Sequence, residues 1–134
     1  MEITKNEKYV IYTPNSAVLD ENIGAQMEKS IAVLYATTGM INFILDLKNV
    51  TSISDAGIKL LQKVQKITKD ESGLWVLVSQ DDSLMDDIAN RSQEFILILP
   101  SVEEAIDAVF MNELENDFKD EQEDDFGFEA ESDY

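Results

Sequence analysis

The stretch NFILDLKNVTSISDAG, at residues 42–57, constrains the fold more than any other part of the chain. From Phe43 to Leu47 it is apolar apart from Asp46, which is typical of a strand covered on both faces, as in a parallel sheet. A polar turn follows at residues 49–54, and the pattern then predicts a helix that begins near Asp55. The free N–H groups and the dipole of a helix start favour negative charge. Open α/β sheets usually present their functional loops at the carboxyl-terminal ends of the strands, so we expect the functional site at this turn and helix start.

Strand and helix patterns alternate at short spacing along the chain. Strands are predicted near residue 3 and at residues 9–12, 41–47, 74–79 and 95–99, and the first two form an antiparallel hairpin at the sheet edge. Helices are predicted to start at Asp20, near Asp55, at Asp81 or Asp82, and at Ser101, where S-V-E-E forms a capping box. This order predicts an α/β fold with a mixed, mainly parallel sheet of four or five strands and about four helices.

The negative charge of the chain is concentrated at its carboxyl end. The 134 residues carry a net charge of −18, of which −10 lies in residues 113–134 and the remaining −8 in residues 1–112. We therefore predict a folded domain at residues 1–112, followed by an acidic, disordered tail at residues 113–134. So acidic a chain is not expected to bind nucleic acid or an anionic membrane surface.

The composition also limits the chemistry. There is no cysteine for disulfides, and no histidine, which is the commonest general base and metal ligand. The chain has no P-loop, nucleophile elbow or zinc signature, so we expect no catalytic residue, metal or cofactor, and no enzyme. A hydrolase built on Ser54 and Asp55 would need a lysine in place of the histidine base. No apolar run approaches the roughly 20 residues of a membrane span, which favours a cytoplasmic location.

Two segments resemble the STAS domain of the anti-sigma factor antagonists. That signature is a hydrophobic strand, then D-L-x-x-V-x-x-hydrophobic, then D-S-S-G or D-S-T-G and a helix. The residues that fall on it here are Asp46, Leu47, Val50, Ile53, Gly57 and Ile58. Residues 17–20, AVLD, resemble the G-x-L-D start of the first helix of the family, without the glycine. The order of the elements is similar from about residue 2 to residue 112.

The resemblance implies a bacterial, non-enzymatic signalling module that regulates transcription by partner switching. Its partner would be an anti-sigma factor or a related GHKL-type, kinase-like protein. In phosphorylated members the first serine of D-S-S-G accepts phosphate from that kinase. Aligned on Gly57, this position is Asp55, with Ser54 before it and Ala56 after it. Since a carboxylate cannot accept phosphate from a serine kinase, any switch in this chain must work differently.

The residues of this loop have structural as well as functional interpretations. Asp55 is either a helix-capping acid, stabilised by about 0.3–1 kcal/mol through the dipole, or a permanent charge where the family has a removable one. Ser54 is either an N-cap or a displaced phosphoacceptor, and Ser52 is a further candidate. Aspartate would mimic phosphoserine only in part, because the phosphate carries nearly two charges.

Four lysines line one side of the predicted second helix: Lys59, Lys63, Lys66 and Lys69. They form either a solvated face or a docking surface for an acidic partner or for the tail of the chain itself. The partner-binding residues that the resemblance implies are Ser52, Ser54, Asp55, Ala56, Gly57, Lys59, Lys63 and Lys66. The alternative function is a STAS module that senses a small ligand, a nucleotide or a lipid, near the same loop. The sequence leaves the oligomeric state open.

Overall fold

The computed structural model describes residues 1–126, with side chains to residue 118. The elements are β1 (Glu2–Lys5), β2 (Val10–Thr13), β3 (Val18–Leu19), α1 (Glu21–Thr38), β4 (Asn42–Asp46), β5 (Ser52–Ile53), α2 (Asp55–Asp70), β6 (Leu74–Val78), α3 (Asp82–Arg91), β7 (Leu97–Leu99) and α4 (Val102–Phe126).

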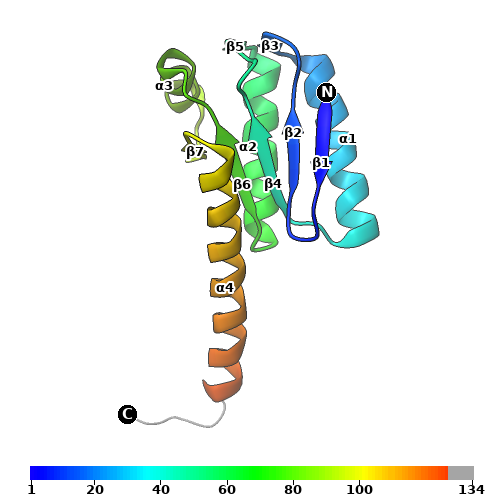
Figure 1. The fold of residues 1–134 in the computed structure, drawn as a ribbon, viewed down its shortest axis with the longest axis vertical. Coiled ribbons are helices and arrows are strands. Elements are labelled where there is room, and N and C mark those ends of the chain that lie inside the picture. Colours follow the sequence, from blue (N-terminus) through cyan, green and yellow to red (C-terminus); the bar gives the residue numbers. More distant parts are fainter. Residues whose placement is uncertain (127–134) are drawn as a thin grey trace.

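A five-stranded sheet forms the middle layer of the domain (Figure 1). Its strand order is β1-β2-β4-β6-β7, in which β1 is antiparallel to β2 and all other neighbours are parallel. This confirms the predicted α/β fold with a mixed, mainly parallel sheet. A second, two-stranded parallel sheet joins β3 to β5, so part of the segment predicted as a turn is a short strand.

The central strand β4 is buried along its whole length, as its apolar sequence predicted. Phe43 and Leu45 point into the larger core, which β4 shares with α1, α2 and α3. Ile44 lies on the opposite face and packs with Ala105 and Val109 of α4. The sheet therefore separates α4 from the other three helices.

Side chains cap the helices at the positions that the sequence indicated. Asp20, Asp81 and Ser101 each accept a hydrogen bond from the backbone N–H three residues later, at 3.2, 3.1 and 3.1 Å. Satisfying these free N–H groups stabilises a helix start by typically about 1 kcal/mol. Gly39 ends α1 in the left-handed conformation, with φ of 73°, which glycine adopts without strain.

Three details differ from the sequence predictions. β7 covers residues 97–99 only, and Phe95, predicted in that strand, is 80% exposed in the link from α3. The spacing of Leu60, Leu61, Val64 and Ile67 predicts one apolar arc on α2. Ile67 is nevertheless 41% exposed, because the buried arc passes through Leu61, Val64 and Thr68 and leaves Ile67 at its margin. α4 continues through residue 112 to Phe126. The division into a domain at 1–112 and a tail at 113–134 stays a prediction, and residues 127–134 lie outside the described chain.

A buried asparagine ties four elements together at the amino-terminal edge of the parallel strands. Asn42, the first residue of β4, is 2% exposed. Its amide nitrogen donates to the Lys8 carbonyl at 3.0 Å and to the Glu113 carboxylate of α4 at 2.8 Å. Its amide oxygen accepts from the Leu74 N–H of β6 at 3.0 Å. This side chain therefore fixes α4 and the hairpin turn against the sheet.

We expect Asn42→Ala to lower the free energy of unfolding by about 1–3 kcal/mol, because buried polar groups lose their partners. Urea denaturation monitored by circular dichroism measures the loss. The control is Asn90→Ala, an exposed position on α3, which should change stability by no more than about 0.5 kcal/mol. Equal losses in the two variants would contradict the role given to Asn42.

Candidate functional site

The structure brings together the two segments that carried the sequence signature. β5 pairs with β3, so that Ser52 lies opposite Val18 and Ile53 opposite Leu19. The backbone N–H of Ser54 then donates to the Leu19 carbonyl at 3.0 Å. This small sheet lies at the carboxyl-terminal ends of the parallel strands and leads directly into α2 (Figure 1). Residues 52–57, hereafter the signature loop, are therefore at the edge where the functional site was expected.

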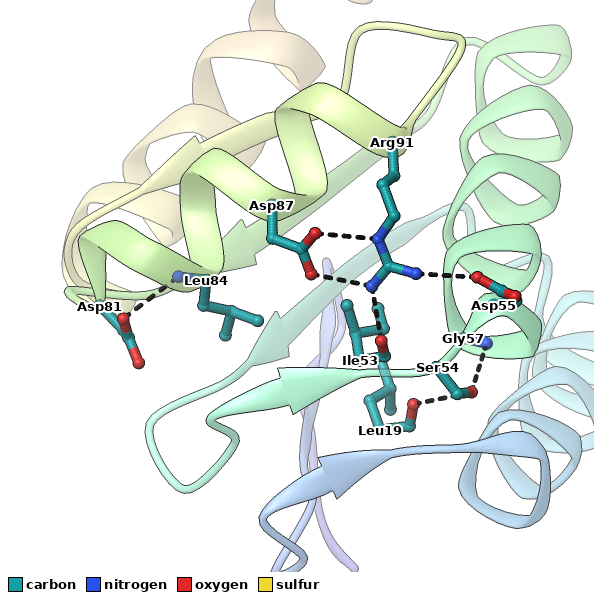
Figure 2. Close-up of polar contacts among 9 residues, drawn as sticks. All are labelled: Leu19, Ile53, Ser54, Asp55, Gly57, Asp81, Leu84, Asp87 and Arg91. Carbon is teal, nitrogen blue, oxygen red and sulfur yellow. Dashed lines mark hydrogen bonds and ion pairs between the residues drawn. The ribbon is translucent and has the colours of Figure 1, made fainter.

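Ser54 is the N-cap of α2, as the structural interpretation proposed. Its Oγ accepts a hydrogen bond from the Gly57 N–H at 3.1 Å and donates one to the Leu19 carbonyl at 3.3 Å (Figure 2). Gly57 has to be a glycine, because a Cβ at this position would lie 2.6 Å from the Leu19 carbonyl oxygen. The loop is thus held against β3 by a cap and by close backbone packing.

Asp55 is the first residue of α2, and its side chain is 93% exposed. One carboxylate oxygen, Oδ1, lies 2.9 Å from Nη1 of Arg91 (Figure 2). The carboxylate therefore stands at an accessible helix start, where the dipole favours it. It is not an isolated charge, because a cation from α3 partly neutralises it.

Arg91 is the residue of this site that the sequence analysis missed. It is the only arginine of the chain and the last residue of α3. Its guanidinium bridges three groups: the Asp55 carboxylate, the Ile53 carbonyl at 2.5 Å, and Asp87 through two parallel bonds of 2.9 and 2.8 Å (Figure 2). The available signal was the Asp87–Arg91 pair at i, i+4 on a predicted helix, but the contact with the loop comes from the fold.

The Asp87–Arg91 pair also sets the charge state of this site. The hydrogen bond from Arg91 lowers the pKa of the Asp87 carboxyl below its ordinary value; burial opposes this shift, and the charge of Arg91 adds to it. The same hydrogen bond raises the already high pKa of Arg91. Arg91 is therefore a permanent cation that Asp87 orients toward the loop.

A second contact links the segment after α3 to α2. The Gln93 N–H donates to the side-chain carbonyl of Gln62 at 2.6 Å. Because Asp55, Lys59, Gln62 and Lys66 are spaced at i, i+4, i+7 and i+11, they share one face of α2, and residues 91–93 run along it. The highly exposed Phe95 follows two residues later.

The predicted lysine row is exposed but not uniformly free. Lys59, Lys66 and Lys69 are exposed on α2, whereas Lys63 forms an ion pair with Glu28 of α1. A groove of about 360 Å³ separates the two helices, and its lining includes Glu21, Glu28, Ala56, Lys59 and Lys63. The acids of this groove come from α1 and the lysines from α2, so the lysines nearest the loop do not form a purely basic surface.

The structure places most of the predicted site residues close together, but not all of them at the surface. Ser52, Asp55, Ala56 and Lys59 are exposed, whereas Ser54 is half-buried and Gly57 is buried. Lys66 lies about 16 Å along the helix from Asp55 at 1.5 Å per residue. Another cavity, of about 410 Å³, opens at the sheet edge, where Asp46, Ser79, Asp81 and Ser101 line it. No cluster of three or more potential metal ligands occurs among the described residues. Within residues 1–126 no helix is both long and apolar enough to span a bilayer.

Comparisons with known proteins give the family and the fold. The family model described as the STAS domain matches residues 1–105. A Thermotoga maritima protein assigned as an anti-sigma factor antagonist has a TM-score of 0.69 and 19% identity, covering 81% of this chain and 92% of that one. An RsbS variant from Moorella thermoacetica has a TM-score of 0.68 and 10% sequence identity, with 81% of this chain and 92% of that one covered. Phosphorylated SpoIIAA from Bacillus has a TM-score of 0.64 and 15% sequence identity, with 81% of this chain and 97% of that one covered. No curated protein sequence matches this chain.

Removing the arginine should loosen the signature loop. In Arg91→Ala, we expect the amides of Ser54 and Gly57 to exchange with solvent about tenfold faster, because the loop loses its link to α3. Hydrogen exchange monitored by NMR measures this rate. Lys66→Ala, which removes a cation from the adjacent helix without touching the loop, serves as the control. Unchanged loop exchange in Arg91→Ala would show that the arginine does not hold the loop.

The lowered pKa of Asp87 predicts a pH dependence with a definite sign. A depressed folded-state pKa stabilises the protein above the ordinary aspartate range, and this contribution is lost as the pH falls through the folded-state value. The stability difference between wild type and Asp87→Asn should therefore be present at neutral pH and shrink in acid. Urea denaturation over a pH series measures it. A difference that stays constant into acid would refute the assigned shift.

Proposed function

Because the chain belongs to the STAS domain family, we propose that it is a non-enzymatic regulatory module that binds another protein through the signature loop and the adjoining face of α2. The proposed partner is a kinase-type anti-sigma factor or a related GHKL-type switch protein. The structures named as anti-sigma factor antagonists support this class of function. A cytoplasmic role in transcription control belongs to the same proposal.

The observation that carries the proposal is the exposed helix start at Asp55, held in place from two sides. On one side, the Ser54 hydroxyl donates a hydrogen bond to the Leu19 carbonyl of β3. On the other side, Arg91 of α3 donates one to the Ile53 carbonyl. Preorganised loops lose less entropy on binding, which favours affinity. The exposed aromatic ring of Phe95 adds an apolar group of the kind that often anchors protein interfaces.

The ion pair with Arg91 refines the proposed role of Asp55. As the phosphoacceptor-equivalent residue it supplies a fixed charge, whereas a phosphoserine carries nearly two charges and three acceptor oxygens. Because Arg91 already neutralises part of this charge, a partner meets less repulsion than it would at a phosphorylated serine. We therefore propose that Asp55 resembles the phosphorylated state only weakly, and that the loop remains competent to bind.

The two candidate phosphoacceptors differ in accessibility. Ser54 Oγ is engaged in two hydrogen bonds and is part-buried, so its phosphorylation would break the cap of α2. Ser52 is exposed on β5. If this loop is phosphorylated, Ser52 is the better substrate. The proposed control is by mass action: a partner bound to this domain cannot hold its other client.

One observation favours the alternative function of ligand sensing, namely the cavity of about 410 Å³ at the sheet edge. Such edges commonly bind ligands in open α/β sheets. However, the carboxylates of Asp46 and Asp81 line the cavity and would repel the phosphates of a nucleotide. In a thermal-shift panel of nucleotides, a rise in the melting temperature of the protein with any one of them would favour the alternative.

The proposal is tested by capture from the source cells followed by titration with the purified partner. We expect a GHKL-type ATPase to be captured, and Ala56→Arg to weaken its binding at least tenfold, which is about 1.4 kcal/mol. The reason is that Ala56 is exposed at the centre of the proposed contact. Isothermal titration calorimetry measures the affinity. Val33→Arg, at a 51% exposed position on α1, should bind normally.

Incubation with the captured partner and ATP tests the role of Asp55 separately. Asp55→Ser should acquire a phosphate at residue 55, as mass spectrometry of the peptide would show, while the wild type does not. Capture of no ATPase, or equal affinity of Ala56→Arg and wild type, would contradict the proposal.

A further inference from the structure

α4 is docked to the domain along one side only. Ala105 and Val109 are fully buried against the sheet. One and two turns further, Asn112 and Asn116 donate hydrogen bonds of 3.0 and 2.9 Å to the carbonyl of Ser72, in the turn between α2 and β6. Beyond this point the helix projects past the edge of the sheet (Figure 1). The side of α4 that faces the domain is therefore defined through residue 116.

The opposite side of α4 carries a row of large apolar side chains. These residues, hereafter the outer stripe, are Phe110, Met111, Leu114 and Phe118, with exposed fractions of 43, 61, 64 and 60%. Positions 110, 114 and 118 are spaced at i, i+4 and i+8, which places them on one face of a helix. Phe110 also packs edge-on against Tyr9, with ring centroids 6.4 Å apart. The outer stripe is thus a continuous apolar surface that no described residue covers apart from this contact.

The charges around the outer stripe select its occupant. Residues 113–126 contain eight acidic residues and one lysine, and Asp107, Glu115 and Asp117 are exposed beside the stripe. A second copy of the chain would bring two acidic helices together, and like charges across an interface oppose binding. Residues 127–134 are also acidic, with three acids and no basic residue. A basic amphipathic helix complements both the apolar row and the acidic margins.

We propose that the outer stripe of α4 is a docking surface for a positively charged amphipathic helix of a partner protein. The apolar residues would supply a helix-in-groove contact, and the acids would set the specificity and speed of association. The surface lies on the other face of the sheet from α2 and at the opposite end from the signature loop (Figure 1). It can therefore be occupied together with the proposed signature-loop partner, and it does not depend on that function.

The test uses the full chain and two synthetic helical peptides with the same leucine heptads, one with lysine and one with glutamate at the polar positions. We expect fluorescence anisotropy to show binding of the lysine peptide only, and Leu114→Ala/Phe118→Ala to weaken it at least tenfold. The control, Val33→Ala/Ile67→Ala, removes two exposed apolar side chains from α1 and α2 and should bind as wild type. Circular dichroism confirms that each variant is folded.

Four results would overturn the proposal. In the first, the lysine peptide does not bind. In the second, it binds the α4 variant as tightly as the wild type, which would mean that charge attraction alone explains the binding. Sedimentation shows a dimer that Leu114→Ala/Phe118→Ala dissociates, which would make a second copy the occupant. Binding appears only after residues 127–134 are removed, which would make the chain's own end the occupant.

Discussion

The double burial of β4 is the constraint on which the rest of this structure depends. All of its residues are buried, and successive side chains enter different cores. A strand of this kind needs a helical layer on each face, so α1, α2 and α3 lie on one side and α4 on the other. Asn42, at the start of the same strand, satisfies its amide with groups from the hairpin turn, β6 and α4. The layers are thereby joined at the edge opposite the signature loop.

The arrangement of layers determines what the signature loop can do. The loop follows β4 in sequence, pairs with β3 through β5, and receives Arg91 from α3, so three separate parts of the chain fix it. The result is a rigid helix start with an exposed carboxylate whose charge is partly neutralised. This geometry is the basis of our proposal that the site recognises a protein surface.

The same layers give the molecule two independent surfaces. The signature loop and the face of α2 belong to the three-helix side, whereas the outer stripe of α4 belongs to the other. Where α4 packs on the sheet, it lies on the face opposite α2 and its lysines. For the residues described here, this does not support the hypothesis that the acidic end of the chain covers the lysine row. α4 instead presents its acids around an apolar row of its own.

Apolar periodicity and capping residues predicted the five strands of the main sheet, the helices and their starts, because these depend on neighbours in sequence, but they did not predict β3 and β5. The same local patterns placed Ser54, Asp55 and Gly57 at a helix start. They misplaced Ile67 and Phe95, because burial at the margin of an element depends on which element packs against it. Arg91 could not be assigned to the site from its sequence neighbours alone, since Ile53 and Asp55 lie far from it along the chain. The sequence by itself thus determined the fold class and the loop, and only the tertiary structure decided which cation holds that loop and which face of α4 remains uncovered, because both depend on contacts between distant segments.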